Sequence, residues 1–377
     1  MPRFVSSNHG NSLMHEQFMR ECFQLAEKGR GYVSPNPLVG AVLVEEGRCV
    51  ARGFHKRFGG VHAEVHCLRN YTGDLSNAVL YVNLEPCSHH GKTPPCTDLL
   101  IQRGVRKVVI AMKDPNPLVT GKGITQLRRA GIHVTVGVLE KEARHLNRFF
   151  VKHIANSLPY VLLKIAQTAD GFIGRKNGSL EYITSPESRR LVHKWRSEYD
   201  AVLVGAGTIQ ADNPRLTVRL WTGRDPAAVI LDGKFRLTGR ERVFASARHR
   251  RVYFCVSKQA MKARPSMAKY FKSIGVNLIA LAGRNGDLNL KSVLYELSAR
   301  QIGSILVEGG SNVFSSFIRQ RYVDELSVFC SPVVFGNGIP RFSEADRSNA
   351  MLREMILSSG FSARKSGTDI LFTGTIA

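Results

Sequence analysis

The residues of this chain whose types and spacing could carry chemistry are concentrated between His62 and Cys96. One imidazole, from His62, and two thiolates, from Cys87 and Cys96, are ligands that zinc prefers. Three protein ligands leave the fourth tetrahedral position to water, which is typical of a catalytic rather than a structural zinc site. Zinc lowers the pKa of its bound water to about 7, so hydroxide is available at neutral pH. The spacing therefore predicts a hydrolytic zinc centre.

A carboxylate stands beside these three residues. Glu64 follows His62 by two positions, too close to be a convenient fourth ligand, but well placed to move a proton from the water to a leaving amine. His-x-Glu, followed by Pro-Cys and a second Cys, is the signature of zinc deaminases. A structural zinc knot, or three unrelated residues, is the alternative interpretation.

The segment between the two cysteines is longer than that signature requires. Eight residues, SHHGKTPP, separate Cys87 from Cys96 and carry polar side chains of their own. Since the three-ligand set is already complete, the neighbouring histidines are expected to contact substrate or solvent: His66, His89 and His90.

Alternating strands and helices must position these residues. His62 is expected to open a helix, and a buried strand at 77–84 delivers Cys87 to the next helix start. Asn36 precedes a strand at 38–44, where its amide could read the edge of a base or simply make a turn. The other expected elements are a disordered leader at 1–12, helices at 15–28, at 97–103 and after Gly123 as far as Ala130, a strand ending at 53–55, and strands at 107–112 and 132–137. This alternation predicts a three-layer α/β domain.

A boundary is expected near residues 145–159, where a helix at 140–154 runs into Asn-Ser-Leu-Pro. The second half repeats the alternation. Its expected strands are 160–166, 202–204, 227–231, 251–256, 276–280 and 304–307, and its expected helices are 186–197, 261–273, 290–300 and 312–319. Two glycine turns, Gly205-Ala206-Gly207-Thr208 and Glu308-Gly309-Gly310-Ser311, follow strands and could cradle a phosphate with backbone N–H groups. Either could also be turn chemistry alone.

The length and composition of the chain limit the classes of protein to which it can belong. The chain has 377 residues, enough for two domains, and is 43% hydrophobic. No apolar run approaches the length of a membrane span, and the start, MPRFVSSNHGNS, lacks the apolar region of a signal peptide. The seven cysteines show no disulfide framework, which fits a reducing cytosol. We therefore expect a cytoplasmic protein without a membrane-spanning segment.

The chain is strongly basic, with a formal net charge of +23. Such a charge can indicate nucleic acid, phosphorylated small substrates and cofactors, or a basic proteome. Lys and Arg are spread along the chain and are not interleaved with aromatic residues as in a base-stacking platform. This distribution favours small phosphates over nucleic acid.

Taken together, several segments resemble the bifunctional riboflavin-biosynthesis deaminase–reductase family. The matching segments span residues 34 to about 340: SPNPLVGAV, HAEVH, LEPCSHHGKTPPC, DPNPLV, ADNPRLTVR and VEGGS. The resemblance implies a cytidine-deaminase-like domain at 1–150, followed by a dihydrofolate-reductase-like α/β domain at 151–377. It implies hydrolytic deamination of a diaminopyrimidinone ribosylamino phosphate, and then reduction of the ribosyl group to ribityl with NADPH.

The resemblance also implies roles for particular residues. In the first domain, His62, Cys87 and Cys96 would bind zinc while Glu64 shuttles protons. The residues that would contact the deaminase substrate are Asn36, His89, Lys92 and Thr93. Those that would line the NADPH site are Ala166, Tyr182, Thr208, Asp212 and the turn from Gly310. Those that would face the reductase substrate are Arg196, Leu216, Arg219 and Glu308.

The chain departs from the family pattern in the reductase half. A Lys or Arg usually follows Asp-Gly, where this chain has Phe172, and a Trp is usual where it has Tyr182. A serine that usually lies two residues earlier is replaced by Leu180. These changes leave open the alternative that the chain is a deaminase whose second domain has no reductase activity and only binds or stabilises.

Two further alternatives come from the charge. A nucleic-acid deaminase would share the His-Ala-Glu segment, but such enzymes have Pro-Cys-x-x-Cys and need no second domain with phosphate turns. A zinc-stabilised RNA-binding protein would have no use for Glu64. Whether the chain forms a homo-oligomer is left open by the sequence.

Overall fold

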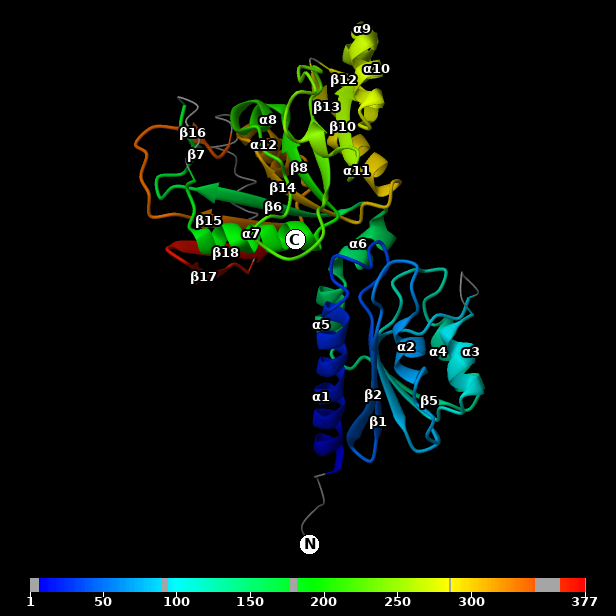
Figure 1. Cartoon of the computed structure of the whole chain (residues 1–377). Coiled ribbons are helices and arrows are strands. Elements are labelled where there is room, and N and C mark those ends of the chain that lie inside the picture. Colours follow the sequence, from blue (N-terminus) through cyan, green and yellow to red (C-terminus); the bar gives the residue numbers. More distant parts are fainter. Residues whose placement is uncertain (1–6, 90–93, 177–181, 285, 343–359, 377) are drawn as a thin grey trace. The chain divides into compact units, whose positions relative to one another are not determined.

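The structure is a computed structural model that describes residues 7–89, 94–176, 182–284, 286–342 and 360–376. The chain divides into two units, Met1–Ser157 and Leu158–Ala377. Each unit is built on one large sheet (Figure 1). The division lies within the interval 145–159 in which the sequence places a boundary.

The first unit has a five-stranded sheet in the order β2-β1-β3-β4-β5. Strands β3, β4 and β5 are parallel, whereas β1 is antiparallel to both β2 and β3. The strands are β1 (Gly40–Glu45), β2 (Arg48–Phe54), β3 (Val79–Leu84), β4 (Lys107–Met112) and β5 (His133–Val136). Their apolar residues alternate between two cores, so both faces of the sheet need a helical cover.

Helices cover both faces of this sheet, as the sequence predicted. Helices α1 and α5 pack on one face and α2, α3 and α4 on the other (Figure 1). The helices are α1 (Ser7–Glu27), α2 (Ala63–Leu68), α3 (Cys96–Gln102), α4 (Lys122–Arg129), α5 (Glu140–Leu146) and α6 (Arg148–Asn156). The result is a three-layer α/β arrangement.

Two expectations for this unit were wrong. The leader predicted at 1–12 is helical from Ser7, because an existing helix gains one hydrogen bond for each residue added, even in a polar segment. The single helix predicted at 140–154 is divided at Asn147. The Asn147 amide is buried and bonds both backbone groups of Leu38, accepting from its N–H at 2.8 Å and donating to its carbonyl at 3.0 Å.

The second unit has a nine-stranded sheet in the order β11-β10-β9-β8-β14-β6-β15-β18-β17. It is parallel from β11 to β15 and antiparallel from β15 to β17. Its strands are β6 (Tyr160–Gln167), β8 (Ala201–Gly205), β9 (Ala227–Leu231), β10 (Val252–Ser257), β11 (Asn277–Leu281), β14 (Ser304–Gly309), β15 (Glu325–Cys330), β17 (Ser362–Ser366) and β18 (Asp369–Thr375). Two short ribbons accompany it, β7 (Phe172–Gly174) with β16 (Ile339–Pro340) and β12 (Gly283–Arg284) with β13 (Asp287–Leu288).

Helices again lie on both faces of this sheet. α11 and α12 pack on the larger core, whereas α7 and α10 pack on the opposite face. The helical segments are α7 (Pro186–Glu198), α8 (Ala206–Asp212), η1 (Phe244–Ser246), α9 (Lys258–Ala263), α10 (Pro265–Ser273), α11 (Leu290–Ser298) and α12 (Ser311–Arg319). This is an α/β unit with a mixed sheet.

The second unit also corrects the sequence prediction. The helix expected at 261–273 is two helices, because Pro265 cannot donate to the preceding turn and opens a new helix instead. The strands β15, β17 and β18 were not predicted. In the part of the chain that the structure describes, no helix has the length and apolar character needed to cross a bilayer.

Candidate functional site

Three elements of the first unit bring the predicted zinc ligands together. His62 is the N-cap of α2, Cys87 follows β3, and Cys96 is the first residue of α3. Their ligand atoms all lie within 4.8 Å of one another, and they form the one group of this kind among the described residues. The Nδ1 atom of His62 is 3.3 Å from the Cys96 sulfur and 3.5 Å from the Cys87 sulfur. This donor set and spacing fit a zinc ion with an open fourth position.

The electrostatics of the thiols also fit a cation. A hydrogen bond from Cys96 lowers the pKa of the Cys87 thiol to about 4, although burial opposes the change. His62 and the backbone N–H of Cys96, 3.3 Å from the sulfur, lower this pKa further. A thiolate is therefore favoured at Cys87, and the thiolate is the form of cysteine that binds metal.

Glu64 lies in the first turn of α2, as predicted, and is buried. Burial and then the nearby charge of Cys87 raise the pKa of its carboxyl to about 7. A carboxyl whose pKa lies near neutrality can both accept and return a proton, which is the property a general acid–base group needs.

Asn36 is connected to this centre through a histidine that the sequence did not single out for chemistry. Its amide nitrogen is 3.1 Å from His55 Nε2, and the rings of His55 and His62 meet edge to face at 5.9 Å. The loop after Asn36 is clamped by the buried Asn83, which accepts from the N–H of Gly40 and donates to the carbonyl of Leu38. Asn36 is therefore linked to the predicted ligand His62 through His55.

The remaining predicted contacts of the deaminase are only partly described. His89 is exposed and interacts electrostatically with Asp114, whereas Lys92 and Thr93 lie outside the described residues. A buried carboxylate that the sequence analysis missed, Glu85, holds the loop that carries Asp114. Its oxygens accept backbone N–H groups at 2.9–3.2 Å from Asp114, Gly121 and Ile124. Glu85 could have been found in the sequence from its position in the Leu-Glu-Pro-Cys segment, two residues before Cys87.

In the second unit the two glycine turns face each other. Gly205 is the N-cap of α8 and Gly310 is the N-cap of α12. A Cβ atom on Gly309 would lie 2.8 Å from the side chain of Val204, and one on either Gly309 or Gly310 would lie 3.0 Å from Thr208 Oγ1. Glycine keeps this approach open, so Thr208 and Gly310 line one cradle at two adjacent strand ends. Such a cradle fits the phosphates of a dinucleotide.

The other residues predicted to line the NADPH site lie on elements around this cradle. Ala166 is on β6, which pairs with β14, and Asp212 is the exposed last residue of α8. Tyr182 precedes α7 and is 78% exposed, with the Arg189 guanidinium 4.2 Å from its ring centre. The exposed ring leaves one flat surface available to a ligand.

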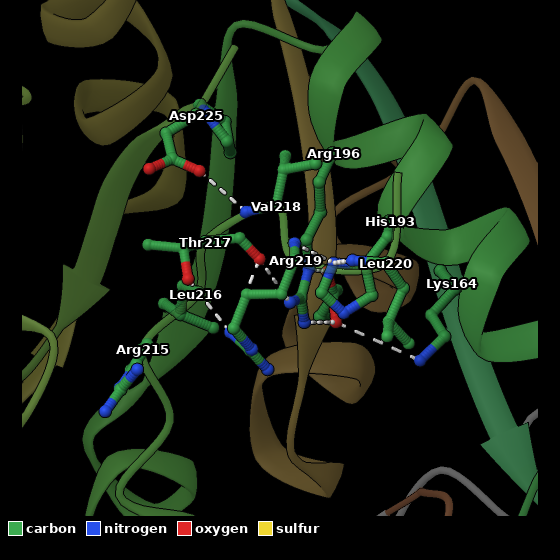
Figure 2. A network of polar contacts seen from close by, with 12 residues as sticks. Lys164, His193, Arg196, Arg215, Leu216, Thr217, Val218, Arg219, Leu220 and Asp225 are labelled. Carbon is green, nitrogen blue, oxygen red and sulfur yellow. Dashed lines mark hydrogen bonds and ion pairs between the residues drawn. The ribbon is translucent and has the colours of Figure 1, made fainter. Parts of the chain in front are cut away.

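The residues predicted for the reductase substrate converge in one polar network (Figure 2). Arg196 of α7 forms two hydrogen bonds, of 2.6 and 2.8 Å, to the carboxylate of Glu308 at the end of β14. Lys164 Nζ of β6 lies 4.0 Å from the same carboxylate. Burial would raise the pKa of Glu308, but the guanidinium of Arg196 and then the ammonium of Lys164 lower it to about 2. Glu308 is therefore a buried anion held by cations.

The loop that carries Leu216 and Arg219 joins this network (Figure 2). Arg196 donates to the carbonyl of Thr217 at 3.2 Å, and the backbone N–H of Arg219 donates to His193 Nδ1 at 2.9 Å. Leu216 is buried at a positive φ of 56°. Burial and Arg196 lower the pKa of His193 to about 4, so its imidazole is neutral at pH 7. The network thus brings together all four predicted residues: Arg196, Leu216, Arg219 and Glu308.

Sequence analysis missed two members of this network, Lys164 and His193. Lys164 was detectable as the one charge inside the apolar run Tyr-Val-Leu-Leu-Lys-Ile-Ala, whereas His193 had no signal beyond its place in an amphipathic helix. Phe172, which departs from the family pattern, is in β7 and pairs with Pro340 of β16. Leu180 lies outside the described residues.

Comparison with known proteins agrees with this geometry. Residues 13–112 match the cytidine and deoxycytidylate deaminase zinc-binding region, and residues 159–361 match the RibD C-terminal domain. The riboflavin biosynthesis protein RibD of Aquifex aeolicus is 41% identical over 86% of this chain and 88% of its own length. RibD of Actinobacillus pleuropneumoniae is 39% identical over 88% of this chain and 87% of its own length.

Two solved structures resemble the whole chain. One is a diaminohydroxyphosphoribosylaminopyrimidine deaminase/5-amino-6-(5-phosphoribosylamino)uracil reductase from Thermotoga maritima, 40% identical, with a TM-score of 0.83 over 97% of this chain and 100% of that one. The other is RibD of Acinetobacter baumannii, 32% identical, with a TM-score of 0.84 over 97% of this chain and 99% of that one.

Proposed function

The chain belongs to the RibD family of riboflavin biosynthesis enzymes, and from this membership we propose how its own residues divide the work. The protein is a zinc-dependent pyrimidine deaminase and an NADPH-dependent reductase. It hydrolyses an amino group of a diaminopyrimidinone ribosylamino phosphate and then reduces the ribosyl group to ribityl. We assign deamination to residues 1–150 and reduction to residues 151–377.

In the deaminase half, His62, Cys87 and Cys96 would hold zinc, which would supply an acidic water as nucleophile. Glu64 would accept a proton from the attacking water and return it to the leaving amine, so that hydrolysis replaces the amino group by a carbonyl oxygen and releases ammonia. The pKa of about 7 supports this exchange, since it lets the carboxyl carry the proton between the two events. Asn36 orients the pyrimidine, while His89, Lys92 and Thr93 bind its phosphate side.

In the reductase half, NADPH supplies the hydride, and the protein orients cofactor and substrate. We propose that Ala166, Tyr182, Thr208, Asp212 and Gly310 line the cofactor site. Arg196, Leu216, Arg219 and Glu308 then position the ribosyl phosphate, with the Glu308 carboxylate held in place by Arg196. A preorganised carboxylate can hold a ribose hydroxyl without reorientation during the reaction.

The observation that carries this proposal is the His62, Cys87 and Cys96 set within 4.8 Å beside the buried Glu64. The test is a mass-spectrometric product assay in which the zinc-loaded chain receives the diaminopyrimidinone ribosylamino phosphate with or without NADPH. We expect a deaminated product without NADPH, and a product that is both deaminated and reduced with it. A product that stops at deamination in both cases would instead support a second domain that has lost its chemistry, which Phe172 would then explain.

We further propose that the enzyme acts in the cytoplasm on this phosphorylated pyrimidine and not on nucleic acid. The free state of all seven cysteines supports a reducing compartment. The basic charge supports phosphorylated ligands. Size-exclusion chromatography with light scattering would determine whether the chain is a homo-oligomer.

A further inference from the structure

Arg341 bonds to Gln167, the neighbour of the proposed cofactor residue Ala166, and has no role in the proposed function. It directly follows β16, whose Pro340 pairs with Phe172 of β7. The carbonyl of Pro340 accepts a hydrogen bond from the hydroxyl of Ser311, the first residue of α12. The ribbon of β7 and β16 is therefore fastened to the start of α12, directly after Gly309 and Gly310.

Within the described part of the chain, the contacts of Arg341 use few of its donors. Its Nη1 donates to the side-chain carbonyl of Gln167 at 2.7 Å, and its guanidinium lies 5.6 Å from the ring of Phe342. Gln167 is buried, ends β6 and directly follows Ala166. A guanidinium offers five N–H donors, and one neutral acceptor satisfies only one of them.

No carboxylate pairs with Arg341 among residues 7–89, 94–176, 182–284, 286–342 and 360–376. Three other partly buried arginines of the unit have more polar partners than Arg341. Arg196 is paired with Glu308 and Arg224 with Asp200, while Arg250 donates to three backbone carbonyls. Burial lowers the pKa of Arg341, as expected for a desolvated cation with no anion beside it.

We propose that Arg341 is a phosphate-binding residue of the reductase site. Guanidinium groups bind phosphate oxygens through paired, charge-assisted hydrogen bonds. The start of helix α12, whose first residue Ser311 bonds to the carbonyl of Pro340 directly before Arg341, also favours an anion through its free N–H groups. The phosphate belongs either to the dinucleotide cofactor or to the ribosyl phosphate. This inference rests on the proposed reductase function and adds one residue to its ligand-binding set.

The test compares three variants of the full, zinc-loaded chain with the wild type. Arg341→Met removes the charge and keeps the length of the side chain, while Arg341→Lys keeps the charge without the paired geometry. Arg364→Met removes an exposed arginine of β17 and serves as the matched control for net charge. Ammonia release and the melting temperature report whether each variant is folded.

Two measurements distinguish the sources of the phosphate. Calorimetric titration gives the Kd for NADPH, and the product assay gives the KM for the deaminated substrate. We expect Arg341→Met to raise either the Kd for NADPH or the KM for the deaminated substrate by about tenfold or more, because a charge-assisted hydrogen bond is lost. Arg341→Lys should fall in between, and Arg364→Met should match the wild type. A larger Kd for NADPH would show that Arg341 binds a phosphate of the cofactor. A larger KM would show that it binds the phosphate of the substrate.

Unchanged values in a folded Arg341→Met chain would overturn the inference. If Arg341→Met does not fold, the Arg341→Lys chain decides, because wild-type Kd and KM with lysine would show that paired phosphate recognition is absent. A wild-type chain that neither binds NADPH nor reduces the substrate would instead remove the proposed reductase function, and this inference with it. The two failures are therefore separate, since one is seen only in the variants and the other already in the wild type.

Discussion

Replacing Glu308 by Gln should destabilise the second unit by about 3 kcal/mol at pH 7. The Glu308 side chain is only 8% exposed and accepts two hydrogen bonds from Arg196. Its carboxyl pKa falls from 4.5 to about 2 in the fold, against the effect of burial, because of Arg196 and Lys164. A difference of this size corresponds to about 3 kcal/mol, at about 1.4 kcal/mol per pKa unit. The neutral amide would also leave Arg196 buried without its counter-ion.

The two tryptophans of the chain allow this unit to be observed by itself. Both Trp195 and Trp221 belong to the second unit, so intrinsic tryptophan fluorescence reports its unfolding without a contribution from the first. Denaturant titrations of the wild type, Glu308→Gln and Glu296→Gln give the free energy of unfolding from midpoint and slope. Glu296 of α11 forms an exposed pair with Arg300, which lies beyond the end of that helix, so the Glu296→Gln chain should stay close to the wild type in stability.

The pH dependence gives an independent check of the same reasoning. Because the pKa of Glu308 is lower in the folded state, its stabilisation is fully present above about pH 4.5 and is lost as the pH falls toward 2. The difference between wild type and Glu308→Gln should therefore be constant from pH 7 to 5 and shrink below that. A Glu308→Gln chain that unfolds at the wild-type denaturant concentration at pH 7 would refute the assignment of Glu308 as a stabilised buried anion.

Three shorter predictions concern the first unit. Glu64→Gln should reduce ammonia release by about a hundredfold or more while the zinc content, measured by atomic absorption, stays at the wild-type level; retained deamination would remove Glu64 from the mechanism. Removal of zinc by a chelator should abolish ammonia release and leave NADPH binding intact, as calorimetry can check; loss of both would mean that the metal supports the whole chain. Gly40→Ala should lower the melting temperature of the deaminase half, because the Cβ atom of the alanine would lie 2.1 Å from the carbonyl oxygen of Cys22. An unchanged melting temperature would show that α1 can move away from the new side chain without loss of stability.

The sequence predicted most of the elements that carry the candidate metal centre. Apolar runs bounded by turn residues gave β4 at its observed limits, and the polar His62 before an apolar helix gave the start of α2. These features are local, because a buried parallel strand and a helix N-terminus each leave their pattern within about ten residues. The three proposed metal ligands, which lie at such element ends, could therefore be found before the fold was known.

Features that depend on distant contacts could not be predicted. Nothing in the local pattern around Asn147 ends a helix, and the break follows from its side-chain bonds to Leu38, which is 109 residues away in sequence. The neutral state of His193 likewise depends on burial and on Arg196 and Arg219, and not on its neighbours in sequence. Side chains that act through tertiary contacts leave no periodicity by which the sequence could identify them.

The C-terminal strands show how far this limit extends into the reductase site. The first four residues of β17 are exposed and give no apolar alternation, so no strand is predicted there. Yet the Asp369 carboxylate, at the start of β18, accepts the backbone N–H of Ser185 at 2.9 Å, and the Ser185 and Ser188 hydroxyls donate to the carbonyl of Ser366. These bonds fix the first turn of α7, the helix that also carries Arg196. The orientation of Arg196 toward Glu308 therefore depends on a hairpin that the sequence pattern did not indicate, even though the sequence alone identified both members of that pair.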